Sequence, residues 1–345
     1  MPETFDNLRG DEHIVLAHGG GGELTRRLLA ERIVPKLAND LLSPLTDSAV
    51  LATPGERICF TTDAFVVQPL EFPGGDIGRL AVCGTVNDLA VMGAVPKALS
   101  LALVIEEGLA MATLDRIVDS IAAAAEEAHV PIATGDTKVV ERRGGDGMTV
   151  TTAGVGELAG EPLPGAAGVQ PGDAILITGR IAEHGLAVMS AREGLRFETR
   201  LVSDVAPLGG LVQAMLASGS DVRFLRDPTR GGLAGVLADL ADDTRLRVEV
   251  DEEAVPLSPT ARHAAELLGL DPLTVANEGK VVAVAAAADA ERLLAACRAH
   301  RFGHDAAVIG RVGERTDLPL VELVTRIGGR RVVQRPYGEE LPRIC

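Results

Sequence analysis

The chain has no tryptophan, one tyrosine and seven phenylalanines among its 345 residues. Such a sequence offers almost no aromatic surface on which nucleobases could stack. It is also short of positive charge, since 33 basic residues against 49 acidic ones leave a net charge of −16. A chain of this charge repels phosphate backbones, so we expect no nucleic-acid binding.

Long apolar segments and paired cysteines are missing as well. The longest apolar run, residues 281–288, is far shorter than the roughly 20 residues that a membrane-spanning helix needs. Residues 1–13 are acidic and do not resemble a signal peptide. The cysteines stand far apart in the sequence, which favours reduced thiols; they are Cys59, Cys83, Cys297 and Cys345. We therefore expect a cytoplasmic protein with no membrane contact, in which the first three cysteines are core residues.

Hydrophobic periodicity predicts an α/β unit in the first half of the chain, whose 46% hydrophobic content allows a large core. Asp76 is the expected N-cap of the first long helix. One strand is expected to stop at Gly135-Asp136, and 148–155 alternates like a strand of an antiparallel sheet. The predicted strands are 57–63, 97–105, 131–134 and 148–155, and the predicted helices are 77–93 and 114–129.

A second α/β unit is predicted after residues 160–172, where three prolines and four glycines mark a domain boundary. A hairpin is expected to turn at Gly328-Gly329. The predicted strands are 174–178, 246–250, 281–285, 321–325 and 331–334, and the predicted helices are 185–191, 208–216, one opening at 231–232, and 259–268. The sequence thus predicts domains at 1–159 and 170–333, followed by a flexible tail, 334–345.

The tail carries the most informative residue, the cysteine of Pro342-Arg343-Ile344-Cys345. Prolines and a glycine exclude a helix there, and about ten extended residues span roughly 30 Å. Such an arm could carry a sulfur from one pocket to another, so we expect Cys345 to move. The α-carboxylate should raise the thiol pKa and Arg343 should lower it; which effect wins stays open.

A glycine run precedes an apolar helical pattern near the start of the chain. It consists of Gly19, Gly20, Gly21 and Gly22, after His18. Glycines let backbone N–H groups approach a ligand, and the following helix N-terminus favours an anion. The run lacks the ending of a Walker motif, so a phosphate loop and a flexible connection both remain open.

Four aspartates lie at the edges of apolar elements or inside them: Asp47, Asp63, Asp88 and Asp136. A buried carboxylate needs a cation or several donors. Oxygen ligands in this number suit Mg²⁺ shared with ATP phosphates. Each aspartate alone could also be a cap or a turn residue.

Two further motifs supply cations and a carboxylate. Residues 226–232, with Arg226 and Arg230, open a helix and could attract an anion, or could form an ordinary helix start. Residues 277–280, Asn-Glu-Gly-Lys, place Glu278 at a turn before a strand, or form an ordinary polar turn.

Taken together, the motifs resemble the HypE hydrogenase maturation family, within the superfamily of aminoimidazole ribonucleotide synthetase, selenophosphate synthetase and thiamine monophosphate kinase. The aspartate motifs indicate the superfamily, and the Pro-Arg-Ile-Cys ending singles out the HypE family. The resemblance covers almost the whole chain, through residues 18–22, 61–67, 72–78, 84–89, 135–140, 226–232, 277–280 and 342–345.

The resemblance implies a two-domain α/β fold with mixed sheets, in which the N-terminal sheets of a homodimer join into a β-barrel beside the ATP site. It also implies an activity. A HypF carbamoyltransferase would load the Cys345 thiol, and ATP would drive dehydration of the thiocarbamate to a thiocyanate. The cyano group would pass to iron on a HypC–HypD scaffold of the [NiFe] hydrogenase.

The matching motifs also imply site residues. Cys345 would carry the group, Glu278 would be the base, and Lys138 would polarise a phosphate or carbamoyl oxygen. ATP would be held by Gly19, Gly20, Gly21, Gly22, Asp47, Asp63, Asn87, Asp88, Asp136, Thr137 and Arg230, and Mg²⁺ by Asp47, Asp63, Asp88 and Asp136. Two alternatives stay open: a small-molecule kinase, which gives Cys345 no role, and a metal or partner scaffold with Cys345 as a soft ligand.

Overall fold

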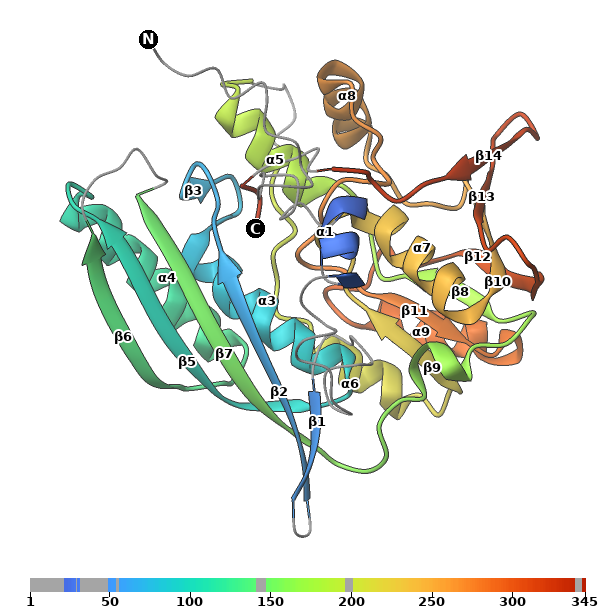
Figure 1. The fold of residues 1–345 in the computed structure, drawn as a ribbon, viewed down its shortest axis with the longest axis horizontal. Helices are drawn as coiled ribbons and strands as arrows, with labels where there is room; N and C mark the ends of the chain where they lie inside the picture. The colour runs from blue at the N-terminus through green and yellow to red at the C-terminus, as the bar shows by residue number, and fades with distance from the viewer. Residues whose placement is uncertain are drawn as a thin grey trace.

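The fold, a computed structural model, is built on two β-sheets that lie side by side with helix α3 between them (Figure 1). It describes residues 22–28, 30–31, 49–53, 56–140, 147–195, 201–338 and 343–345. The described helices are α1 (Glu23–Leu28), α3 (Ile77–Val91), α4 (Met111–Glu127), α5 (Glu183–Arg192), α6 (Gly209–Ala217), α7 (Gly232–Thr244), α8 (Pro259–Leu268) and α9 (Ala290–Ala299). Short 3₁₀ turns lie at Gly165–Gly168 and Ala287–Asp289.

The first sheet is mixed and has the strand order β1-β2-β7-β5-β6. Its only parallel pair is β5–β6 within the described strands, joined through α4 as a βαβ unit. Helices α3 and α4 cover one face, and β7 alternates strictly between buried and partly exposed residues. The strands are β1 (Ala49–Thr53), β2 (Glu56–Phe65), β5 (Val95–Glu106), β6 (Ile132–Val140) and β7 (Met148–Leu158).

The other face of the first sheet is exposed and partly apolar. Phe60, Val104 and Val140 point from it with 43%, 38% and 38% of their surface accessible. Register places Lys138 opposite Val104, whose side chain is exposed between the buried Leu103 and Ile105. Lys138 and Asp136 therefore lie on the face that α3 does not cover.

The second sheet has seven strands in the order β14-β13-β10-β12-β8-β11-β9. Its central strands β8 and β11 are buried along their whole length, since α5, α7 and α8 contribute to the core on one face and α6 and α9 to the core on the other. The strands are β8 (Ala174–Ile177), β9 (Val222–Arg226), β10 (Leu246–Asp251), β11 (Val282–Ala285), β12 (Ala307–Arg315), β13 (Val321–Val324) and β14 (Arg330–Val333).

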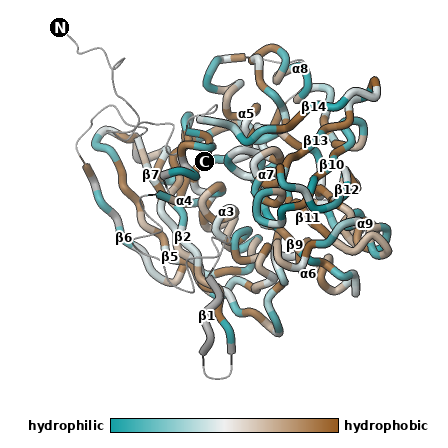
Figure 2. The backbone as a smooth tube through the Cα atoms, turned by 45° about the vertical axis from the view of Figure 1, so that its right-hand side comes forward, coloured by the Kyte–Doolittle hydropathy of each residue, from teal (hydrophilic) through white to brown (hydrophobic). Residues whose placement is uncertain are grey.

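The C-terminus lies between the two sheets in both Figure 1 and Figure 2. Ile344 is only 2% exposed and belongs to the apolar cluster of Phe65, Val67 and Phe72. Phe72 comes from a small hairpin, β3 (Glu71–Phe72) and β4 (Gly75–Asp76). The tail that was expected to be flexible is thus docked at its end in this structure.

Most predicted elements are confirmed, including the Asp76 cap, whose carboxylate accepts from the Arg79 N–H at 2.9 Å. The expected stop at Gly135-Asp136 is wrong, because β6 continues to Val140 alongside β5. Gly135 lets β5 approach, since a Cβ there would lie 2.5 Å from the carbonyl oxygen of Leu101. Strands β1, β3, β4, β9 and β12 and helix α9 were not predicted.

The expected core role of Cys59, Cys83 and Cys297 is confirmed, since all three are at most 1% exposed. Within the described ranges, no helix is long and apolar enough to span a membrane.

Candidate active site

The centre of the site is the turn that carries Glu278, which is held from both sides by buried asparagines. Asn277 accepts from the Ala182 N–H at 2.7 Å and donates to the carbonyl oxygens of Pro228 and Val275 at 2.9 and 3.1 Å. The turn is therefore tied to the start of α5 and to the loop before α7. Ala182 has a φ of +72°, a costly conformation for alanine that this bond helps to hold.

Asn87 holds the same turn from the first half of the chain. Its amide donates to the carbonyl oxygens of Ala206 and Glu278 at 3.0 and 3.3 Å, and its Oδ1 accepts from the Leu208 N–H at 2.7 Å. Asn87 is 1% exposed. Its polar groups thus join α3 to the second half of the chain, a role that the sequence did not suggest.

The Glu278 side chain is 2% exposed, and its Oε1 has no hydrogen-bond partner among the described residues. Burial raises its pKa well above the ordinary value, and the negative charges of Asp227, Asp204 and Asp63 raise it further. The positive charge of Arg230 acts in the opposite direction. A buried carboxyl with a raised pKa and a vacant acceptor is suited to take a proton from a ligand.

The Cys345 thiol lies within hydrogen-bonding reach of the Glu278 carboxyl. Burial and the charge of Glu278 raise the thiol pKa, while Arg230 opposes the shift. The docked sulfur is therefore held as a neutral thiol. The sequence left open whether the thiol pKa is raised or lowered. In this position of the tail it is raised, by burial and by Glu278.

Arg230 acts on three groups of the site, because its charge lowers the pKa of Glu278, Cys345 and Asp63. Its own side chain is exposed. The structure thus brings the predicted anion-binding arginine to the predicted base and carrier.

Asp63 and Asp88 meet where β2 passes α3. Burial raises the pKa of Asp63, and a hydrogen bond to Asp88 partly offsets that shift. Thr85 donates to Asp63 at 3.0 Å, and Thr61 donates to Asp88 at 2.8 Å. Two carboxyls in contact must share a proton or a cation, so this pair fits a divalent cation.

The described residues contain no group of three acidic, histidine or cysteine side chains close enough to hold a metal. Asp136 lies on the opposite face of the first sheet from Asp63, so the two do not converge within one chain. Asp47, Gly19, Gly20 and Gly21 lie outside the described residues.

Lys138 is also not brought to Glu278 within one chain. It lies in edge strand β6, three strands from β2, on the exposed face of the sheet. Thr137 is its neighbour in β6. Gly22, which was expected to belong to a phosphate-binding loop, lies against the tail. A Cβ on this residue would be only 2.2 Å from the carbonyl oxygen of Pro336.

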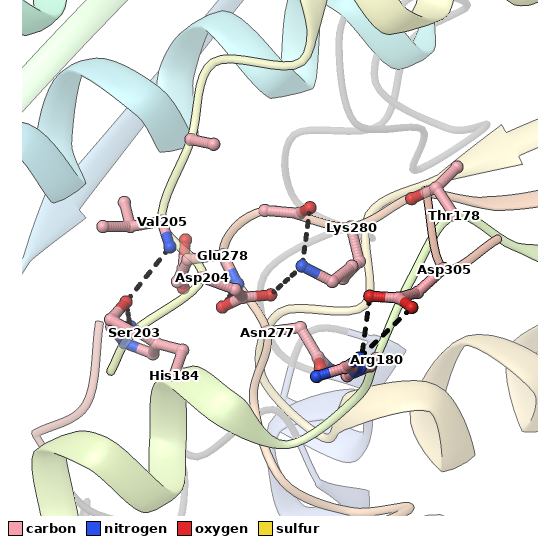
Figure 3. A network of polar contacts seen from close by, with 12 residues as sticks. Thr178, Arg180, His184, Ser203, Asp204, Val205, Asn277, Glu278, Lys280 and Asp305 are labelled. Carbon is pink, nitrogen blue, oxygen red and sulfur yellow. Dashed lines mark hydrogen bonds and ion pairs between the residues drawn. The ribbon is translucent and has the colours of Figure 1, made fainter. Parts of the chain in front are cut away.

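A buried ion pair that the sequence did not predict supports the turn from behind. Figure 3 shows Asp204 between Lys280 and the Ser203–His184 pair. Lys280 Nζ lies 3.0 Å from Asp204 Oδ2, and Asp204 Oδ1 accepts from the Glu278 N–H at 3.1 Å. Burial would raise the pKa of Asp204, but the charge of Lys280 lowers it overall.

These residues were missed for different reasons. Lys280 and Asp227 belong to the motifs at residues 277–280 and 226–232, but the sequence suggested no role for either side chain. His184 gives a weak signal, as a polar residue at the start of an apolar helical stretch, and Asp204 lies in a segment without periodicity.

Comparisons with known proteins agree with this geometry. Residues 45–158 match the N-terminal domain of AIR synthase related proteins, and residues 170–321 match the C-terminal domain. Carbamoyl dehydratase HypE of Cupriavidus necator is 51% identical over 333 residues, 96% of this chain and 95% of the relative. The Escherichia coli K12 protein of that name is 42% identical over 338 residues, 96% and 99% of the two chains.

Solved structures give the same result. The chain matches HypE of a HypE–HypF complex with a TM-score of 0.84 and 44% identity, covering 90% of this chain and 99% of that one. It matches HypE in complex with ATP with a TM-score of 0.81 and 42% identity, covering 96% and 100%. The resemblance predicted from the motifs is confirmed: the chain belongs to the carbamoyl dehydratase HypE family, within the AIR synthase-like superfamily.

Proposed function

We propose that this chain uses ATP to dehydrate a carbamoyl group on Cys345 to a thiocyanate, with Glu278 as the base. The observation that carries the proposal is the pairing of the Cys345 thiol with a buried carboxyl whose second oxygen has no hydrogen-bond partner among the described residues. A carbamoyl group on this sulfur would bring an NH₂ group, the donor that Glu278 lacks.

The reaction needs two proton losses from one nitrogen. The carbamoyl oxygen attacks the γ-phosphorus of ATP and ADP leaves, while an N–H proton passes to Glu278 and a C=N bond forms. The second N–H proton then leaves and the C–O bond breaks, which gives the thiocyanate and inorganic phosphate. Phosphorylation is required because a bare amide oxygen is a poor leaving group, and Arg230 is placed to offset negative charge beside the sulfur.

Mg²⁺–ATP is proposed to bind at the Asp63–Asp88 pair, since two contacting carboxyls suit a hard cation. The ion would offset charge on the phosphates. We retain Asp47, Asp136, Thr137 and Gly19–Gly22 as proposed ATP ligands. Asn87 is better explained as a positioning residue, because its amide is fully used by backbone groups.

Lys138 is proposed to act from the partner subunit of a homodimer. It lies on the exposed, partly apolar face of the first sheet, which is the face that a dimeric β-barrel would close. We also propose domains at 1–159 and 170–333, with 334–345 as the carrier tail.

The cellular context is proposed from the relatives. A HypF carbamoyltransferase would load Cys345, and a HypC–HypD scaffold would receive the cyano group in the cytoplasm. The tail would have to leave the Glu278 pocket for both encounters, since one docked sulfur cannot reach three sites.

The test is whether ADP formation depends on a loaded tail. The wild-type chain, carbamoylated on Cys345, should release one ADP for each thiocyanate formed, and Cys345→Ala should bind ATP without this turnover. ADP formation by Cys345→Ala at the wild-type rate would favour a small-molecule kinase and contradict the proposal.

A further inference from the structure

The last residues of the tail are held by helix α5, which comes from the second half of the chain. His184 Nε2 lies 3.0 Å from the carbonyl oxygen of Ile344. Arg192 Nη2 donates to the carbonyl oxygen of Arg343 at 2.7 Å. Two consecutive carbonyls of the tail, one and two residues before Cys345, thus accept from two side chains of one helix.

The surroundings of His184 fix its hydrogen. A carbonyl oxygen only accepts, so Nε2 must carry the hydrogen and Nδ1 must be the acceptor. Ser203 Oγ lies 2.8 Å from Nδ1 and can donate to it, while Ser203 Oγ accepts from the Val205 N–H at 3.1 Å. The ring is 0% exposed and packs edge-on against Phe72, with centroids 5.4 Å apart. Figure 3 shows the His184–Ser203 contact.

Burial keeps this histidine neutral. It lowers the His184 pKa, although the charge of Asp204 and the Ile344 carbonyl oppose the shift. The charge that acts on the ring is that of Asp204, which is paired with Lys280. A neutral imidazole with its hydrogen on Nε2 donates a hydrogen bond in one direction only. It therefore fixes the position of the Ile344 carbonyl, which a positive charge alone would attract without orienting.

Arg192 also ties the tail to Gln68, in the loop that follows β2. Its Nε donates to the carbonyl oxygen of Gln68 at 2.9 Å, and the Gln68 N–H donates to the carbonyl oxygen of Arg343 at 3.1 Å. The Arg343 side chain donates back to Gln68 Oε1 at 3.2 Å. The peptide before Ile344 is therefore fixed on both sides.

We propose that His184 and Arg192 are positioning residues that latch the tail so that the atom carried by Cys345 meets Glu278. The buried Ile344 side chain stabilises the docked tail through apolar contacts, and the two hydrogen-bond donors fix how far the tail enters its pocket. Because Cys345 follows the held Ile344 carbonyl directly, only a few bond rotations separate the latch from the sulfur. The inference deepens the proposed function, but the latch exists whether or not ATP is turned over.

The first test is the alkylation rate of Cys345 by N-ethylmaleimide in the full-length chain. The other three cysteines are at most 1% exposed, and Cys345→Ser gives the background. A hydrogen bond is typically worth about 1 kcal/mol, so His184→Leu and Arg192→Leu should each accelerate labelling about 5-fold. The double variant should reach roughly 25-fold when the two bonds contribute independently, as the product of the two single effects.

Two variants separate the latch from a general loss of structure. His184→Gln keeps a donor near the Nε2 position and should restore slow labelling. Arg180→Ala removes an arginine that pairs with Asp305, and it should label at the wild-type rate. Arg192 is only half-buried, so its variant keeps the test valid if His184→Leu fails to fold.

Equal labelling rates in wild type and Arg192→Leu would overturn the latch, as would His184→Gln labelling as fast as a folded His184→Leu. The second readout rests on the proposed function: in His184→Leu, dehydration of the carbamoylated tail should slow about 10-fold while loading of the thiol does not. Slowed loading with unchanged dehydration would also contradict the latch. Failure of the wild-type chain to form thiocyanate would overturn the proposed function and leave the labelling result standing.

Discussion

The partly exposed Cys345 thiol lies beside the buried Glu278 carboxyl, although 66 residues separate them along the chain. Glu278 comes from a turn of the second half that Asn87 of the first half holds in place. The tail reaches this turn with its Ile344 side chain buried in the first-half core. The site therefore exists only when both halves and the tail are assembled.

Glu278→Gln should block dehydration without blocking the loading of Cys345. The amide keeps the shape of the side chain but cannot accept a proton, and loss of a general base typically costs about 10²–10⁴-fold. Quench-flow with mass analysis of the C-terminal peptide should find the thiocarbamate accumulating. A thiocyanate yield equal to wild type would remove Glu278 from the reaction.

The docked thiol should react slowly at neutral pH. Burial and Glu278 raise the pKa of Cys345, so the neutral form is favoured in the pocket and docking is strongest below the ordinary thiol pKa of about 8.5. As pH rises through that value, the undocked tail gains thiolate and docking weakens. Alkylation should therefore keep rising above about pH 8.5, where a model thiol levels off, and a rate that levels off together with the model thiol would contradict this.

Asp88→Asn should lower Mg²⁺–ATP affinity by about an order of magnitude or more, because it removes one charge from the Asp63–Asp88 pair. The raised pKa of Asp63 adds a pH dependence: affinity should fall on acidification from a higher pH than an ordinary aspartate would give. Isothermal titration with and without Mg²⁺ measures both effects. Equal affinity in the variant would place the nucleotide elsewhere.

Asn87→Ala should destabilise the fold more than it weakens nucleotide binding. The change leaves the Leu208 N–H and two carbonyl oxygens buried without their partner, at a cost of about 1–3 kcal/mol for a lost buried partner. Thermal unfolding and ATP titration, compared with Asp88→Asn, separate the two roles. An Asn87→Ala protein with wild-type stability and no ATP affinity would restore Asn87 as a nucleotide ligand.

Lys138 offers a test of the dimer. If it acts across the interface, mixed dimers of Lys138→Ala and Glu278→Gln should contain one intact site and one doubly altered site. Co-expression should then recover about a quarter of the wild-type activity, since half the dimers are mixed and each has one site of two. Recovery of no activity would indicate that Lys138 and Glu278 act within one chain.

Local patterns predicted the helices and strands well where apolar periodicity and capping agreed, as in α3 with Asp76. The extent of β6 was missed because Gly135 reads as a strand end, whereas here it allows close approach of β5. The site was predicted only in part for a similar reason. Motif position singled out Glu278 and Arg230, which the structure brings together, but His184 gives only a weak local signal and Asp204 gives none. The contacts of His184 and Asp204 arise from segments that meet only in the folded chain.

Mass analysis of the C-terminal peptide tests the central claim most directly. The wild-type chain would be incubated with its carbamoyltransferase and carbamoyl phosphate, with and without ATP for the second step. The account predicts a carbamoyl group on Cys345 that converts to a cyano group only when ATP is added. A modification on Cys59, Cys83 or Cys297, or a carbamoylated Cys345 that ATP leaves unchanged, would contradict it.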